Sequence, residues 1–205
     1  MYRTRTVILL VLVGVAGGSV SRGAAGASPA ADKPKRAPDS VFVPTPDDVL
    51  AKMLEVAGVT KDDRVYDPGC GDGRIVIAAA KKYGCRGVGI ELSPKLVKEA
   101  QALARRNQVQ NLVRIVEEDI YVVDMSEATV VTLYLLPGMN VKLIPQLQKL
   151  KPGARIVAHD YGFQNRIKPD KVITMTSKED DVEHHIFLWK TPLRVEPPES
   201  GERSP

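Results

Sequence analysis

The chain has 205 residues, of which 43% are hydrophobic and 26% charged, as is typical of one soluble globular domain with a sizeable core. The net charge of +4 argues only weakly for a nucleic-acid partner, because residues 1–27 contain three arginines and no acid, and the remainder has 26 basic against 25 acidic side chains. The two cysteines, Cys70 and Cys85, exclude a disulfide framework and match no metal-site spacing, so two free thiols are expected.

The first 27 residues have the form of a signal peptide. Arg3 and Arg5 precede an apolar run over 7–15, and Ala25-Gly26-Ala27 is a plausible cleavage site. This pattern predicts export, with membrane contact only through the leader if it stays uncleaved. The alternative is a cytosolic protein that begins with an apolar segment.

The folded domain is expected over residues 41–192. Residues 28–40 have no apolar period and predict a flexible linker, and residues 193–205 predict a disordered tail. Near the start of the domain, Thr45 is expected to be the N-cap of a helix that ends near Gly58.

The rest of the chain is organised around residues 64–91. The apolar pair Val65-Tyr66 follows polar residues and predicts a buried strand. The three glycines after it are Gly69, Gly71 and Gly73. Glycines at alternate positions predict a tight turn whose bare backbone a ligand can approach.

Each of two strands in this stretch ends in a carboxylate. Asp67 ends the first strand, and Glu91 ends a second one over 87–91, after a helix over 75–83. The order predicts a nucleotide-type site at the carboxyl edge of a parallel sheet. An acid two residues before the first glycine would repel a pyrophosphate but suits an ammonium and a sulfonium group. Glu91 is placed to accept hydrogen bonds from ribose hydroxyls, so the unit predicts S-adenosylmethionine (SAM).

This stretch resembles motif I and the following acidic motif of the class I, seven-strand SAM-dependent methyltransferases. The resemblance implies an α/β fold with one doubly wound, Rossmann-like domain, whose sheet is mostly parallel and has an antiparallel last strand. The apolar segments in the rest of the chain predict five more strands, which gives seven in total. Further strands are expected at 113–117, 129–134, 154–158, 172–176 and 185–189, and further helices at 93–107 and 140–150.

The resemblance also implies which residues contact the cofactor. In this family an acid after the third strand recognises the adenine amino group, and its apolar neighbour lies against the ring. The matching residues are Asp119 and Ile120, although Asp119 also fits a solvated loop acid. The expected cofactor residues are Thr45, Asp67, Gly69, Gly71, Gly73, Glu91, Leu92, Asp119 and Ile120.

Methyl transfer from a sulfonium requires alignment of the reacting atoms more than acid–base groups, so no triad or metal is needed. Tyr134 and His159 are the catalytic candidates, because both are expected at strand ends on the cofactor side. Tyr134 either orients an acceptor amine or packs under the cofactor, and His159 is either a base or a hydrogen-bonded structural residue. His184 and His185 are adjacent on a strand and point to opposite faces, so no metal site is expected.

A closer resemblance is to the subgroup with the lysine methyltransferases of the mitochondrial ATP synthase c subunit and adenine nucleotide translocase. It is carried by Val-Pro-Thr-Pro at 43–46, Val-Tyr-Asp at 65–67, Gly-Asp-Gly-Arg-Ile-Val at 71–76, Gly-Ile-Glu-Leu at 89–92 and Ala-Thr-Val-Val-Thr-Leu-Tyr-Leu-Leu-Pro at 128–137. The last block stands where base-modifying enzymes often carry Asn/Asp-Pro-Pro-aromatic. The resemblance therefore implies in-line transfer of a methyl group to a nitrogen acceptor such as a protein lysine, and argues against nucleic acid.

Two other classes stay open: a non-catalytic SAM-binding module, and a SAM-fold enzyme that acts on a small molecule, for example by aminopropyl transfer. The expected partner is thus a methyl-acceptor protein or a small molecule. The leader predicts a periplasmic or membrane-anchored protein, whereas the cytosolic synthesis of SAM favours the cytoplasm.

Overall fold

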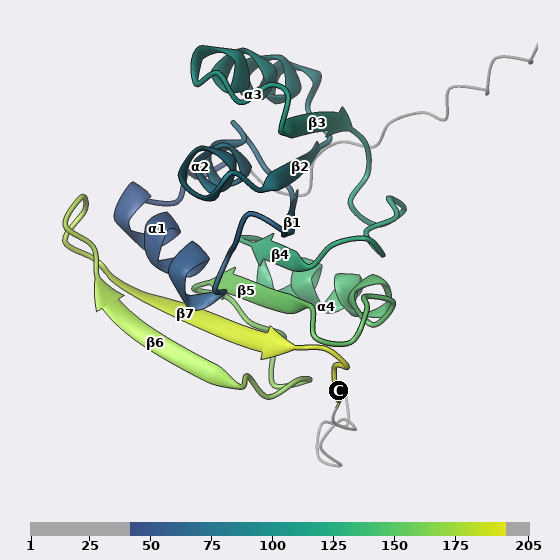
Figure 1. Cartoon of the computed structure of the whole chain (residues 1–205). Helices are drawn as coiled ribbons and strands as arrows, with labels where there is room; N and C mark the ends of the chain where they lie inside the picture. Colours follow the sequence, from purple (N-terminus) through teal and green to yellow (C-terminus); the bar gives the residue numbers. More distant parts are fainter. Residues whose placement is uncertain (1–41, 196–205) are drawn as a thin grey trace, which may run out of the picture. The chain divides into compact units, whose positions relative to one another are not determined.

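The computed structural model describes residues 42–195, so the predicted leader and linker and most of the predicted tail lie outside the described residues. Helices and strands alternate along this part of the chain (Figure 1). The helices are α1 (Asp47–Val56), α2 (Arg74–Tyr83), α3 (Pro94–Arg106) and α4 (Pro137–Leu147). The strands are β1 (Arg64–Pro68), β2 (Arg86–Glu91), β3 (Val113–Glu117), β4 (Val130–Leu133), β5 (Arg155–His159), β6 (Lys171–Thr176) and β7 (Glu183–Lys190).

The seven strands form one sheet in the order β3-β2-β1-β4-β5-β7-β6. The strands from β1 to β5 are parallel, and β7 runs antiparallel between β5 and β6. The predicted α/β class with a mostly parallel seven-strand sheet is therefore confirmed. The chain moves outward from β1 to β3 and then returns to β4 beside β1. This reversal of direction opens a crevice at the carboxyl ends of the strands.

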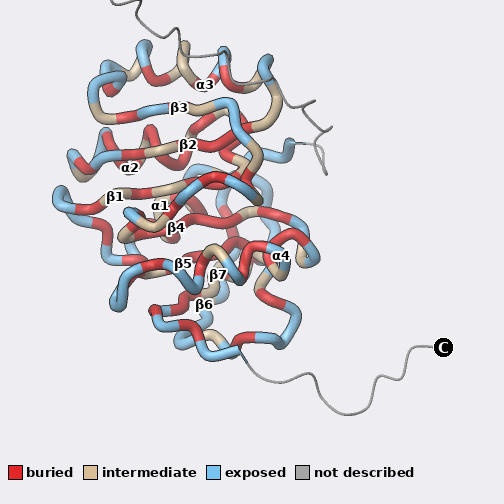
Figure 2. Tube along the Cα trace, turned by 90° about the vertical axis from the view of Figure 1, so that its right-hand side faces the viewer, coloured by how far each residue is buried: buried red, intermediate tan, exposed pale blue. Residues whose placement is uncertain are grey.

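Two layers of helix cover the sheet: α1, α2 and α3 lie on one face and α4 on the other (Figure 1). Successive strand residues point to opposite faces, so Val130 packs with the first layer and Val131 with the second. The central strand β4 is buried along its whole length, whereas the outer surfaces of the helices are exposed (Figure 2). A nearly all-apolar central strand is expected when both faces are covered.

Two helix starts differ from the sequence-based expectation. Thr45 does not cap α1: Pro46 occupies the N-cap position, and the carboxylate of Glu179 accepts hydrogen bonds from the backbone amides of Asp47 and Asp48 at 2.9 and 3.3 Å. A side chain from the β6–β7 loop therefore supplies the acceptor that Thr45 was expected to provide. The helix α4 begins at Pro137, three residues earlier than predicted, because proline is well suited to a first helical turn.

Several smaller expectations are confirmed. Ser93 caps α3, with its hydroxyl oxygen 3.5 Å from the amide nitrogen of Leu96. Cys70 and Cys85 are both free and buried. One expectation differs: Leu193, the first residue of the predicted disordered tail, is buried in the same apolar cluster as Trp189. Among residues 42–195, no helix has both the length and the apolar content needed to cross a membrane.

The stability of the sheet depends on a close approach of α2 to β2 at Gly87. A Cβ atom there would lie 2.8 Å from the Cβ of Val76 and 3.2 Å from its backbone oxygen. We expect Gly87→Ala to lower the free energy of unfolding by about 1–3 kcal/mol, because neither neighbour can move without shifting α2. Urea denaturation of the purified chain measures the change.

Gly138→Ala is the matched control, because Gly138 lies in α4 and a Cβ there would meet nothing within 4 Å. This variant should keep or gain stability, by up to about 1 kcal/mol, since alanine favours a helix over glycine. Equal stabilities for the two variants would show that the approach of α2 to β2 is not a constraint.

Candidate functional site

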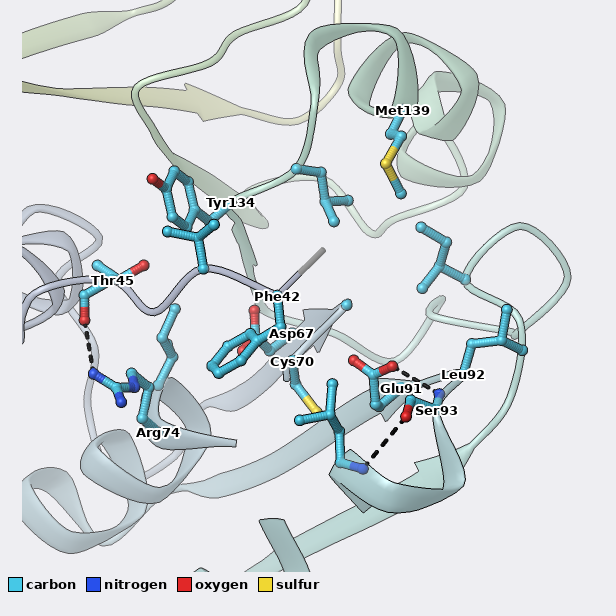
Figure 3. A pocket seen from close by; sticks show the side chains of 16 residues that line it. Phe42, Thr45, Asp67, Cys70, Arg74, Glu91, Leu92, Ser93, Tyr134 and Met139 are labelled. Atoms are coloured by element: carbon cyan, nitrogen blue, oxygen red, sulfur yellow. Dashed lines mark hydrogen bonds between the residues drawn. The ribbon is translucent and has the colours of Figure 1, made fainter. Parts of the chain in front are cut away.

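A cavity lies at the carboxyl ends of β1, β2 and β4, where the strand order reverses (Figure 3). Seven of the residues predicted from the sequence line it: Thr45, Asp67, Gly69, Glu91, Leu92, Ile120 and Tyr134. Four predicted residues are not among its lining: Gly71, Gly73, Asp119 and His159. The structure therefore brings most of the expected site together and assigns a different place to the rest.

The glycine loop is held to the end of β2 by the carboxylate of Glu91. One oxygen accepts a hydrogen bond from the amide of Gly71 at 3.0 Å, and the other accepts one from the amide of Ser93 at 2.8 Å. Glu91 is buried, with 7% of its surface exposed. This side chain thus connects the loop after β1 to the start of α3.

Gly71 and Gly73 shape the loop from outside the cavity lining. Both have positive φ, at 56° and 77°, a backbone conformation that glycine adopts without strain. A Cβ on Gly71 would lie 2.1 Å from the ring of Phe42, and one on Gly73 would lie 3.1 Å from the Cβ of Ala100. The positive φ therefore favours glycine at both positions, and at Gly73 the packing against Ala100 leaves little room for a side chain.

Asp67 is the most deeply placed acid of the cavity, with 3% of its surface exposed. Its carboxylate accepts a hydrogen bond from the hydroxyl of Thr132 at 2.7 Å. Burial, with smaller contributions from the nearby charges of Asp72 and Glu91, raises the pKa of Asp67 to about 7. A carboxylate in this position is best stabilised by a cationic ligand.

Arg74 links the glycine loop to the segment before α1. Its guanidinium forms an ion pair with Asp72 at 2.9 Å and donates a hydrogen bond to the backbone oxygen of Thr45 at 3.1 Å (Figure 3). This contact keeps Thr45 at the edge of the cavity, although Thr45 is not a helix cap.

The loop after β3 presents its apolar residue to the cavity, not its acid. Ile120 is buried and lines the cavity, whereas Asp119 is half-buried and outside the lining. One carboxylate oxygen of Asp119 accepts a hydrogen bond from the amide of Tyr121 at 2.9 Å. Through this contact Asp119 shapes its own loop.

Tyr134 lines the cavity, and His159 lies behind it. The two ring centroids are 4.0 Å apart, and His159 is completely buried. Burial lowers the pKa of His159 to about 4, despite the opposing charge of Asp160, so the ring is neutral. Its nitrogens contact the hydroxyl of Thr45 at 3.3 Å and the Nδ1 of His184 at 2.9 Å. His159 therefore supports Tyr134 and does not face the cavity.

Sequence reasoning missed the apolar lining. Phe42, Val43, Leu96, Leu135 and Met139 all border the cavity. They lie in loops or on helix faces, where an apolar side chain is equally consistent with the core. For Phe42 and Val43 the available signal was the neighbouring Val-Pro-Thr-Pro block at 43–46.

Comparison with known proteins decides the family. The sequence model of one protein family, the ANTKMT methyltransferase domain, matches residues 67–171 of the chain. A protein-lysine N-methyltransferase of Saccharolobus islandicus is 42% identical over 154 residues, which cover 74% of this chain and 94% of that protein. The chain belongs to the ANTKMT methyltransferase family.

Two further relatives agree with this assignment. The lysine N-methyltransferase of the ATP synthase c subunit from Xenopus laevis is 34% identical over 164 residues, covering 80% of this chain and 71% of that protein. A crystal structure described as an RNA methyltransferase from Salinibacter ruber in complex with S-adenosyl-L-homocysteine is 45% identical, with a TM-score of 0.68. The match covers 75% of this chain and 97% of that one. The predicted SAM-dependent methyltransferase, with SAM as cofactor, is confirmed.

The cavity of this ANTKMT-family methyltransferase fits the chemistry of SAM. A buried carboxylate whose pKa is raised favours a sulfonium and ammonium ligand, and the glycine loop leaves the backbone open at Gly69. The apolar residues Leu92 and Ile120 border the same space and suit an aromatic base.

The raised pKa of Asp67 predicts how SAM binding depends on pH. Below about pH 7 the carboxyl group is mostly protonated, and a cationic ligand must displace that proton to bind. We expect the affinity for SAM to fall as the pH decreases below about 7, by up to about tenfold per pH unit, and to level off above it. Calorimetric titrations between about pH 5.5 and 8 measure this.

Asp67→Asn is the control, because it keeps the shape of the side chain and cannot ionise. It should bind SAM more weakly than the natural chain and show little change in affinity over the same range. A parallel pH dependence in both proteins would assign the titration to SAM itself or to another group.

Proposed function

We propose that this enzyme transfers the methyl group of SAM to the side-chain nitrogen of a protein lysine. The names of two relatives support a protein-lysine acceptor: one acts on protein lysine and the other on a lysine of the ATP synthase c subunit. The charge distribution around the cavity supports it independently.

Acidic side chains gather at the carboxyl edge of the sheet, where the cavity opens. The strand β3 ends at Glu117 and is followed by Glu118 and Asp119, and Asp160 follows β5. The β6–β7 loop adds the acidic run 179–181 at the same edge, where Glu179 contacts the start of α1. An acidic rim attracts a lysine-bearing segment and guides it toward the cavity.

Basic side chains begin several strands at the opposite edge. Arg64, Arg86 and Arg155 are the first residues of β1, β2 and β5. Two of them are paired there with acids: Arg64 with Glu127, and Arg155 with Asp63. The acidic rim at the cavity is therefore the observation that carries the proposal of a cationic acceptor.

RNA is the second candidate acceptor, because one similar solved structure is described as an RNA methyltransferase. Binding of RNA depends on basic side chains that neutralise phosphates. An acidic rim around the cavity would instead repel the phosphate backbone, so we favour protein.

In the proposed site the residues of the chain bind and orient. Bound SAM supplies an activated methyl group that leaves a neutral thioether. Asp67 pairs with the cationic tail, and Glu91 accepts hydrogen bonds from the ribose while holding the glycine loop. We assign further cofactor contacts to Thr45, Gly69, Leu92 and Ile120, which line the cavity with them. Gly71 and Gly73, which were also expected to contact the cofactor, contribute by giving the glycine loop its shape.

Tyr134 is our candidate for contact with the acceptor amine, because it borders the cavity at the end of β4. The amine must be neutral to react, and an acidic rim open to water allows its proton to leave. His159 supports the tyrosine ring from behind and keeps it in place.

The test combines the purified chain, SAM with a labelled methyl group, and an extract of the source cells separated into protein and RNA fractions. We expect label in the protein fraction, which acid hydrolysis converts to methyllysine. Label found only in the RNA fraction would show that RNA, and not protein, accepts the methyl group. SAM binding without label in either fraction would favour a small-molecule acceptor or a non-catalytic binding module.

Removal of the Tyr134 hydroxyl should slow catalysis without loss of cofactor. We expect Tyr134→Phe to bind SAM as the natural chain does and to lower the rate of methyl incorporation into extract protein by about tenfold, as for one lost hydrogen bond. Tyr83→Phe, at the end of α2, is the control and should keep the full rate. A fully active Tyr134→Phe enzyme would mean that only the ring matters.

Reversal of one rim charge should weaken acceptor recognition. Glu118 is exposed at the end of β3, so we expect Glu118→Lys to lower the rate at limiting acceptor by about threefold or more, an effect that added salt reduces. Asp62→Lys makes the same charge change at the opposite edge, before β1, and should leave the rate unaltered. Equal rates for the two variants would contradict electrostatic recognition.

A further inference from the structure

A cluster of possible metal ligands lies behind Tyr134, outside the cavity lining. His159 ends β5, Asp160 follows it, and His184 is the second residue of β7. Antiparallel pairing of β5 with β7 brings these three residues together across 24–25 positions of sequence. One nitrogen of each histidine and one oxygen of Asp160 all lie within 4.8 Å of one another.

The distances between these three atoms resemble those between ligands of one ion. The Nε2 atom of His159 lies 2.9 Å from the Nδ1 atom of His184 and 3.3 Å from an oxygen of Asp160. The same oxygen lies 3.0 Å from His184 Nδ1. Metal–ligand bonds of about 2.0–2.1 Å in a tetrahedral site separate ligand atoms by roughly 3.3 Å. A small outward movement of the rings is enough to admit an ion.

In each of the three side chains, the polar atom that points away from the centre of the cluster has a hydrogen-bonding partner. The Nδ1 atom of His159 lies 3.3 Å from the hydroxyl of Thr45, and the Nε2 atom of His184 lies 3.2 Å from a carboxylate oxygen of Asp180. The second oxygen of Asp160 accepts a hydrogen bond from the amide of His185 at 2.8 Å. Partners of this kind orient metal-binding side chains in known sites.

The close approach of His184 to Asp160 favours a positive charge between them. A carboxylate only accepts hydrogen bonds. The Nε2 atom of His184 must therefore carry the proton of its hydrogen bond to Asp180. In a neutral ring the Nδ1 atom then presents a lone pair to the oxygen of Asp160 at 3.0 Å, and these two atoms repel each other. Either a second proton on His184 or a metal ion removes this repulsion.

A metal ion removes this repulsion more completely than a proton. A proton on the Nδ1 atom of His184 is shared between two acceptors, whereas an ion can contact all three inner atoms.

We propose that His159, Asp160 and His184 together bind one divalent transition-metal ion, with Zn²⁺ the best match. Two imidazoles and one carboxylate are a typical ligand set for zinc, which prefers four ligands in a tetrahedron. Water can supply the fourth ligand from the side of Asp160, whose side chain is 25% exposed while those of His159 and His184 are 0% and 7% exposed.

The role of this ion is structural. Neither histidine lines the cavity, and the ring of His159 lies 4.0 Å from that of Tyr134. A metal that joins the end of β5 to the start of β7 would fix His159 and, through it, the tyrosine at the cavity edge. The ion would therefore stabilise the fold without taking part in methyl transfer.

The test uses the full chain after removal of metal with a chelator. Titration with Co²⁺ should produce the visible absorption of tetrahedral cobalt at one equivalent, and Zn²⁺ should abolish it by displacement. Zn²⁺ at about a hundredfold excess over its dissociation constant should also raise the melting temperature by roughly 5 °C or more.

His184→Ala should abolish both effects, and His185→Ala should keep them. The chain contains three histidines in all, and His185 lies on the same strand with its side chain on the opposite face, so it is a matched control. Both cysteines remain in these variants, so any binding by thiols would survive His184→Ala. If that variant fails to fold by circular dichroism, Asp160→Asn replaces it.

Absence of the cobalt spectrum in the natural chain, or equal spectra in both histidine variants, would overturn the proposal. In the first case the cluster is a hydrogen-bonded network with a protonated His184. These outcomes do not depend on the acceptor of the methyl group, so the test is independent of the proposed function.

Discussion

The carboxylate of Glu91 is the contact on which the cavity depends. It accepts one hydrogen bond from the glycine loop after β1 and another from the start of α3, so three segments meet at one buried side chain. Without it the amide of the buried Gly71 would lose its partner, which costs about 1–3 kcal/mol. A cofactor site at this edge therefore exists because the second strand ends in an acid.

Charge is distributed along the strands in a way that serves this site. Acids at the carboxyl ends create a field that favours cations, and burial strengthens the effect for Asp67 by raising its pKa. Both expected substrates, a sulfonium cofactor and a lysine-bearing protein, are cationic. Arginines occupy the opposite ends of β1, β2 and β5, where Arg64 and Arg155 are paired with the acids Glu127 and Asp63.

The seven strands and the glycine loop were predictable because each follows from a pattern within one segment. Expectations that needed a distant partner were less successful. Thr45 has the residue type of a helix cap, yet Glu179 from the β6–β7 loop takes that role. His159 has the residue type of a base, yet β7 covers it and supplies His184 as its neighbour. In each case a residue more than twenty positions away competes successfully with the local preference.

Local patterns were enough to predict the strands, the strand-end acids and the cofactor, because alternating and periodic patterns and glycine turns act over a few residues. Which side chains meet depends on the tertiary structure. It brought the ring of Phe42 over Gly71 and separated Ile120, in the cavity, from Asp119, outside its lining. It also assembled His159, Asp160 and His184 into one cluster. The physical reason is that such contacts depend on strand order and register, which no local pattern encodes.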